Sequence, residues 1–138
     1  ENYNLTYKQH LRLILISTAQ QIHLIDRLLL NNNLTSRKAI IHRIFIGQAR
    51  MVAGLWPNLY EEGSLEFFSD KQLEYTQYPG KIKNDDINYP AGSLLWEFGE
   101  EIAFNSRMQK NHKIILTTIG TYKFYYINND EIMSFIRN

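Results

Sequence analysis

Paired carboxylates are the first residues of this chain whose types and spacing could do chemistry. Adjacent acids occur at Glu61-Glu62, Asp85-Asp86 and Glu100-Glu101. General acid–base catalysis needs two carboxylates that converge on one substrate in environments that separate their pKa values. Neighbouring residues on a helix point about a third of a turn apart, so Glu100 and Glu101 do not converge by themselves. We therefore interpret the acid pairs as solvated surface, and the catalytic residues stay unknown.

Metal and thiol chemistry find little support in the sequence. The histidines lack the short spacings that bring two metal ligands onto one helix face. They are His10, His23, His42 and His112. Cysteine is absent, which excludes disulfides, thiolate zinc sites and cysteine nucleophiles and is compatible with a reducing compartment. We expect neither a metal nor a cofactor.

One segment matches the active-site pattern of a ribonuclease family. The run Arg37-Lys38-Ala39-Ile40-Ile41-His42 resembles the Arg-x₄-His pattern of HEPN-type ribonucleases. The resemblance implies that Arg37 would stabilise a cleaved phosphate and that His42 would protonate it. The same resemblance implies a four-helix bundle, whereas we expect strands after residue 63, so we do not favour this interpretation.

Charge is distributed unevenly along the 138 residues. The first sixty residues carry seven Lys and Arg against two acids, and residues 61–104 carry three against ten. An acidic middle between basic ends neutralises itself on folding, so we expect no nucleic-acid partner. The longest apolar run, Leu13 to Ile16, is too short to cross a bilayer, and we expect a soluble protein without a membrane span.

Helical patterns dominate the first part of the chain. Residues 6–30 carry apolar side chains at helical spacing, Thr6 could cap this helix, and Asn31-Asn32-Asn33 should end it. Residues 36–56 also favour a helix. A strand remains open there, because residues 39–47 are rich in β-branched side chains and end in Gly.

Strand patterns appear later in the chain. The clearest is His112–Asn129, two runs of β-branched and aromatic residues joined at Gly120-Thr121, which favours an antiparallel hairpin with a type II′ turn. Residues 64–78 suggest a second hairpin. Helices are expected from Pro90 to Phe104 and over 130–137. We therefore predict a single α+β domain spanning residues 1–138, an antiparallel sheet of two hairpins packed with three to four helices.

Three segments, taken in order, resemble the chorismate lyase-like superfamily. Leu28–Arg37 is similar to that family's leucine run and Thr-x-Arg turn, and Tyr89–Leu95 is similar to its Pro-x-Gly-x-x-Leu helix start. The hairpins Leu65–Tyr78 and Lys113–Asn128 fall where its sheet strands would lie. The resemblance implies an enclosed ligand cavity and a lyase reaction that uses no metal or cofactor. It places four residues nearest the ligand: Leu34, Arg37, Ala91 and Gly92.

The residues that would carry the lyase reaction do not match. The family's catalytic arginine would fall near Gly63 and its catalytic glutamate near Ile127. Without that cation and acid the reaction loses its charge stabilisation and its proton donor. We therefore expect a binding protein for a small aromatic or carboxylate ligand that lacks lyase activity. The alternative is a protein-interaction module, such as an inhibitor, an immunity protein or a subunit of a larger assembly, because the chain is rich in aromatic residues.

Overall fold

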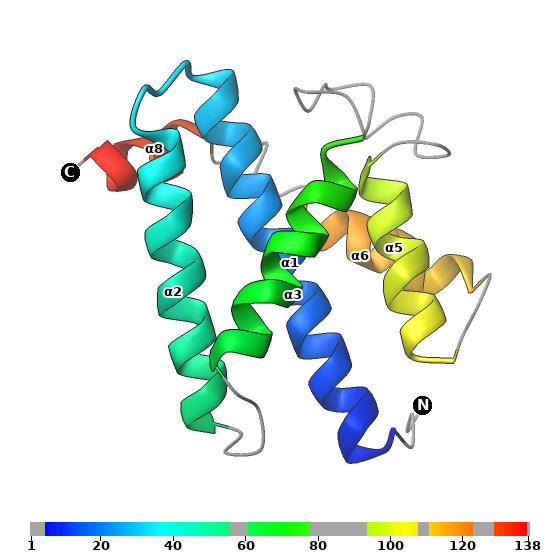
Figure 1. The fold of residues 1–138 in the computed structure, drawn as a ribbon. Coiled ribbons are helices and arrows are strands. Elements are labelled where there is room, and N and C mark those ends of the chain that lie inside the picture. Colours follow the sequence, from blue (N-terminus) through cyan, green and yellow to red (C-terminus); the bar gives the residue numbers. More distant parts are fainter. Residues whose placement is uncertain (1–4, 56–60, 78–93, 108–110, 123–128, 138) are drawn as a thin grey trace.

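The computed structural model describes residues 5–55, 61–77, 94–107, 111–122 and 129–137 (Figure 1). The regular elements in these ranges are all α-helices, and the ranges contain no β-strand. The helices are α1 (Tyr7–Asn31), α2 (Arg37–Leu55), α3 (Glu61–Tyr75), α5 (Leu94–Asn105), α6 (His112–Tyr122) and α8 (Asn129–Arg137).

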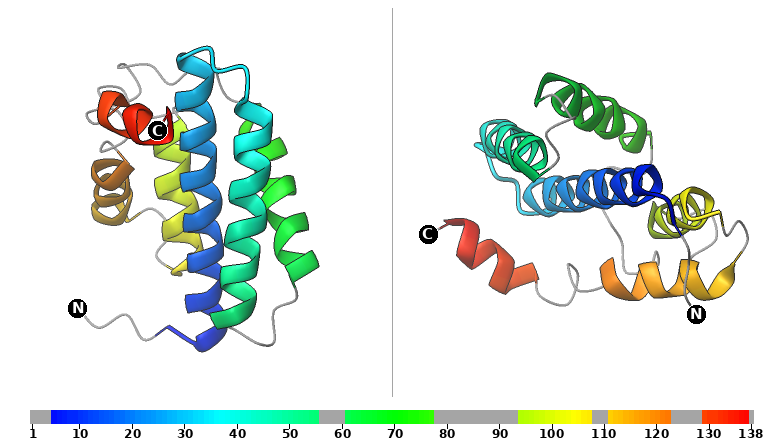
Figure 2. Two further views of the ribbon diagram at one scale, coloured as in Figure 1. Left: turned by 90° about the vertical axis from the view of Figure 1, so that its left-hand side faces the viewer. Right: turned by 90° about the horizontal axis from the view of Figure 1, so that it is seen from below.

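The described helices pack in three layers, with the longest helix in the middle. Figure 2 shows α1 and α5 between the α2–α3 pair on one side and α6 and α8 on the other. Helix α1 contacts α2, α3, α5 and α8, and the most extensive helix contact joins α5 to α6. The core therefore lies around α1 and α5, and any site between helices must be built against one of these two.

Helix α1 has the ends that the sequence predicts. The backbone N–H of Gln9 donates to the hydroxyl of Thr6 at 3.2 Å, and the Thr6 N–H donates to the Gln9 side chain at 2.8 Å. This reciprocal capping box satisfies two N–H groups that the first turn leaves unpaired. At the other end Asn33 adopts a left-handed backbone conformation with φ of 54°, which Asn tolerates better than most residues. The predicted cap and stop are confirmed.

By length and composition, α1 could also cross a membrane. In this fold 61% of its apolar window is buried inside the protein. A buried core helix passes the same test of length and apolarity, so this is weak evidence for a membrane span.

Three other predicted helices are present. Residues 37–55 form α2, which decides the choice between helix and strand in favour of helix. The predicted helix ending near Phe104 is α5, and the predicted terminal helix is α8. The expected helix start at Pro90 lies outside the described residues.

The predicted α+β class is wrong, because both predicted hairpins are helical where the structure describes them. Helix α3 occupies most of residues 64–78, and α6 occupies the first half of residues 112–129. Residues 78 and 123–128 lie outside the described part of the chain. The antiparallel sheet is therefore replaced by helices within the described ranges.

Helix α6 shows why the β-branched residues misled. Threonine hydroxyls can donate to the carbonyl four residues earlier, which satisfies them within a helix. Thr117, Thr118 and Thr121 do so at 2.7, 2.9 and 3.0 Å. Ile115 and Ile119, one turn apart, are buried, so packing against the neighbouring helix overrides their preference for strands. Asn111, whose side chain accepts from the N–H of residue 113 at 3.1 Å, caps the helix and is the sequence signal that the hairpin interpretation missed.

Gly120 provides a direct test of this correction. It is exposed near the end of α6, and a Cβ added there would meet nothing within 4 Å. Because Ala is the better helix former, Gly120→Ala should raise the free energy of unfolding by about 0.5 kcal/mol. In a type II′ turn Gly120 would need a positive φ, and the same change would lower that free energy. Urea unfolding of the two proteins distinguishes helix from hairpin by the sign of the change in the free energy of unfolding.

Candidate functional site

A cluster of polar side chains is buried along one side of α1. Gln20, His23, Asp26 and Arg27 are at most 3% exposed, although polar and charged residues usually remain at the surface. Groups of this kind are stable in a core only when their hydrogen bonds are made. Their partners come from α2, α3 and α5, so the cluster links four helices.

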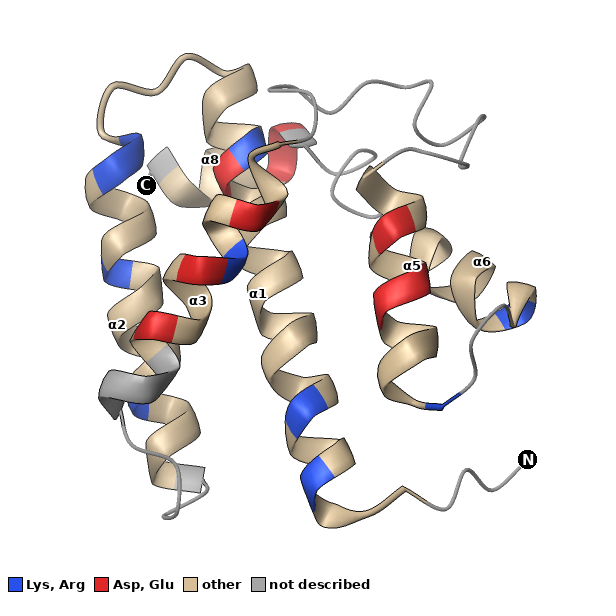
Figure 3. Ribbon diagram, turned by 45° about the vertical axis from the view of Figure 1, so that its right-hand side comes forward, with Lys and Arg blue, Asp and Glu red and all other residues tan. Residues whose placement is uncertain are grey.

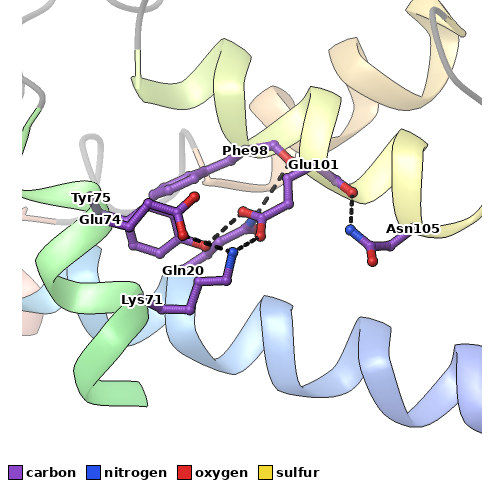
Figure 4. A network of polar contacts seen from close by, with 7 residues as sticks. All are labelled: Gln20, Lys71, Glu74, Tyr75, Phe98, Glu101 and Asn105. Atoms are coloured by element: carbon purple, nitrogen blue, oxygen red, sulfur yellow. Dashed lines mark hydrogen bonds and ion pairs between the residues drawn. The ribbon is translucent and has the colours of Figure 1, made fainter. Parts of the chain in front are cut away.

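One part of the cluster surrounds Glu101 of α5 (Figure 4). The Tyr75 hydroxyl donates to the Glu101 carboxylate at 2.7 Å, and the Gln20 amide donates to the same oxygen at 3.3 Å. Lys71 pairs with Glu101 and, at 3.2 Å, with Glu74. Burial, and then the negative charge of Glu101, raise the pKa of Tyr75 above its usual value. Tyr75 therefore remains a neutral hydrogen-bond donor.

The second part centres on His23. The Arg27 Nε–H donates to His23 Nε2 at 3.0 Å, so this ring nitrogen must be the acceptor. His23 Nδ1 therefore carries the proton and donates to the Gln72 side-chain oxygen at 3.0 Å. Burial, with the neighbouring charge of Arg27, lowers the pKa of His23 to about 4. The imidazole is thus neutral at physiological pH.

The third part brings the cluster to the surface. The Gln72 amide donates to Asp26 Oδ2 at 2.6 Å, and Arg37 binds both oxygens of Asp26, at 2.5 and 2.8 Å. This two-point pairing raises the pKa of Arg37 and fixes the plane of its guanidinium group. Asp26 is buried, but 31% of the Arg37 side chain remains exposed. Arg37 is therefore a cation held from the core and presented to solvent.

Arg37 lies at the edge of a surface hollow of about 260 Å³, which we call the α2–α3 hollow. Lys38, Ile41, His42 and Phe45 line it from one face of α2, at the i, i+3, i+4, i+7 spacing of such a face. Apolar side chains thus lie beside cationic and titratable groups. The full lining is Asp26, Arg37, Lys38, Ile41, His42, Phe45, Gln72 and Thr76.

A second hollow, of about 370 Å³ and lined by α1, α3 and α5, is acidic. Figure 3 shows the acidic residues of α3 and α5 across from each other. Glu101 and Glu74 are already paired with Lys71, and no group of three metal-binding side chains occurs within the described ranges. Glu100 is exposed, as solvated surface should be, whereas Glu101 is only partly exposed and belongs to the buried cluster. We find no converging acid–base pair here.

Of the four predicted ligand-binding residues, the structure brings one to a hollow. Arg37 lines the α2–α3 hollow, whereas Leu34 is half-buried and packs against the hydrophobic core. Ala91 and Gly92 lie outside the described residues. The sequence interpretation missed Asp26 and Gln72, which orient Arg37. The available signal was Asp26 itself, a charged residue next to Ile25 in a helix with apolar side chains at helical spacing.

No family model, curated protein or solved structure matches this chain. The two resemblances fare differently against the fold. The chorismate lyase-like resemblance implies a sheet, which the described residues do not form. The HEPN-type resemblance implies a helical bundle, and α2, α3 and α5 do pack around α1.

Proposed function

We propose that the protein binds a small, flat, singly charged anion, such as an aromatic carboxylate, in the α2–α3 hollow. The observation that carries the proposal is Arg37, which buried Asp26 holds at two points while part of its side chain faces solvent beside an apolar wall. Asp26 occupies the Nε and one Nη of Arg37, so the remaining Nη N–H groups of the guanidinium are the donors available to the carboxylate of a ligand.

The charges around the hollow favour a ligand with a single negative charge. Arg37 and Lys38 contribute two positive charges, and Asp26 contributes one negative charge. Ile41 and Phe45 supply the apolar wall that a flat ring needs. A polyanion would gain little here, because Asp26 already offsets one cation.

The buried cluster prepares the hollow for binding. Gln72 is fixed by His23 on one side and fixes Asp26 on the other, so Arg37 is held before any ligand arrives. Binding to an ordered side chain loses less conformational entropy than binding to a mobile one. The cluster therefore contributes to affinity as well as to the fold.

Titration calorimetry with 4-hydroxybenzoate tests the proposal, with 4-hydroxybenzamide as a neutral compound of the same shape. We expect the acid to bind at least tenfold more tightly than the amide, since a hydrogen bond to a charged group contributes about 1.5–3 kcal/mol. Arg37→Ala should weaken binding by tenfold or more, and Lys38→Ala by a few-fold. Arg43→Ala is the matched control, because Arg43 is an exposed cation of α2 outside the hollow's lining.

Equal affinity for acid and amide would contradict the proposal, as would unchanged binding in both lining variants. Because Arg37 also pairs with Asp26, its variant needs an independent check of folding by urea unfolding. Lys38→Ala removes an exposed side chain, so its effect should report on binding rather than on folding.

A second candidate function is RNA cleavage at the same hollow. The observation that favours it is that Arg37 and His42, the pair of the HEPN-type pattern, both line this hollow in a helical protein. In this function the substrate's own ribose 2′-hydroxyl would attack the phosphorus and lose its proton to water, His42 would protonate the leaving 5′-oxygen, and Arg37 would stabilise the charged phosphate. Incubation with end-labelled single-stranded RNA should then give products that His42→Ala abolishes. If the RNA stays intact and 4-hydroxybenzoate binds, RNA cleavage is excluded and anion binding remains the proposed function.

The interaction-module alternative has less support. It rests on aromatic side chains available to a partner, but Phe68 is buried and Phe67 and Trp96 are partly buried. The other aromatic residues behind that expectation lie outside the described side chains: Trp56, Tyr60, Tyr122, Tyr125 and Tyr126.

A further inference from the structure

A third hollow lies at the opposite end of α1, where that helix meets the end of α5. It measures about 500 Å³, and we call it the basic hollow. Three cations line it, Lys8, Arg12 and Arg107, and none of its described lining residues is acidic. The remaining lining residues are Gln9, Phe104 and Asn105.

The basic hollow also presents an aromatic ring to solvent. Phe104 is 63% exposed, so the face of its ring is accessible to a ligand in the hollow. Arg12, which lines the same hollow, is itself held in place, because its guanidinium lies over the Phe67 ring at 5.1 Å. A flat ligand ring could stack on Phe104 while its charged group meets the cations.

The backbone adds to this arrangement at two points. Lys8 and Gln9 belong to the first turn of α1, the positive end of its helix dipole, which favours an anion nearby. Arg107 has a left-handed backbone conformation with φ of 60°, rare for a residue with a side chain. Arg107 follows the end of α5, and its backbone N–H donates to the Phe104 carbonyl at 3.1 Å. This bond fixes the backbone positions from which the Phe104 ring and the Arg107 side chain extend.

The neighbouring acidic hollow sets a limit on the ligand. The two hollows share Arg12, Phe104 and Asn105, so they adjoin. Glu100, one turn before Phe104 on α5, is exposed on the acidic side. A chain of phosphates running from the basic hollow past Phe104 would meet this carboxylate and be repelled. The hollow therefore suits one phosphate and one ring.

From these contacts we propose that the basic hollow is a second binding site, for a mononucleotide whose base stacks on Phe104 and whose phosphate pairs with Lys8, Arg12 and Arg107. Three cations without a carboxylate match a phosphate that carries close to two negative charges. The α2–α3 hollow differs, because Asp26 reduces its net charge to one positive unit. This site is independent of the proposed function, since the two hollows share no residue.

NMR titration of the whole protein with adenosine monophosphate tests the site. We expect the largest amide shifts at the start of α1 and the end of α5. Adenosine, which lacks the phosphate, should bind at least tenfold more weakly. Phe104→Ala should weaken binding about tenfold, as loss of base–aromatic stacking does elsewhere. Arg12→Ala and Lys8→Ala should also weaken it, whereas Arg43→Ala, which removes an exposed cation outside the basic hollow, should not.

The limit of one phosphate on the ligand has its own test. A tetra-adenylate strand should bind no more tightly than the mononucleotide, and Glu100→Gln should improve the strand's affinity but not that of the mononucleotide. Tighter strand binding by the unmodified protein would overturn the mononucleotide assignment. Two results would overturn the site itself. One is that the nucleotide shifts only amides of α2 and α3; the other is that the Phe104, Lys8 and Arg12 variants bind adenosine monophosphate as tightly as the unmodified protein. All three side chains are exposed, so their loss should leave the fold intact.

Discussion

Replacing Gly99 by alanine should lower the free energy of unfolding by about 1–3 kcal/mol, the usual effect of overpacking a core. Gly99 lies in α5, where that helix packs against α6. A Cβ at this position would stand 2.8 Å from the Ile115 Cα and 2.9 Å from its carbonyl oxygen. These are backbone atoms, so they can move only if α6 moves as a whole. Urea unfolding gives the free energy, and hydrogen exchange of the α6 amides should show faster opening.

Gly47→Ala is the matched control. Gly47 lies inside α2, is exposed, and has nothing within 4 Å of an added Cβ. Alanine is the better helix former there, so this variant should gain up to about 1 kcal/mol. The two substitutions make the same chemical change and should act with opposite signs. A stabilised Gly99→Ala protein would show that α5 and α6 do not pack this closely.

How far the sequence predicts the fold depends on how strong each local signal is. Thr6 and the Asn run at 31–33 correctly predict where α1 begins and ends, because a cap and a left-handed stop act through neighbouring backbone groups. Residues 112–122 were misread, because β-branched residues favour a strand only when the surroundings supply one. Their surroundings include Gly99 of α5, which lets α6 approach closely. That contact joins two different helices, and the pattern of residues within either helix does not encode it.

The candidate site divides in the same way. Arg37 was named from the sequence, through the Thr-x-Arg turn that resembles the chorismate lyase-like superfamily. Its partners could not be named in this way, because Asp26 and Gln72 come from other helices and meet Arg37 only after folding. A buried charge such as Asp26 is recognised only by its partner, and the partner comes from another helix. The sequence therefore predicted one residue of the hollow and not the arrangement that holds it.

Acid should destabilise the protein through His23 by about 3 kcal/mol between pH 7 and pH 4, since each pKa unit corresponds to about 1.4 kcal/mol. The pKa of His23 falls from the ordinary 6.5 to about 4 on folding. Between these values the unfolded chain binds a proton that the folded protein does not, so stability rises with pH. The contribution is complete above pH 6.5 and is lost as the pH falls towards 4.

His23→Gln isolates this contribution. A glutamine can accept from Arg27 and donate to Gln72 as the neutral imidazole does, but it does not titrate. The stability advantage of the parent protein over this variant should therefore shrink by about 3 kcal/mol from pH 7 to pH 4, while carboxylates affect both proteins alike. A constant difference between the parent and His23→Gln would mean that folding does not lower the pKa of His23, so that its Nε2 would be protonated at the same pH in both states and would lose the bond from Arg27. In that case the neutral imidazole would not be what joins the buried cluster to Arg37.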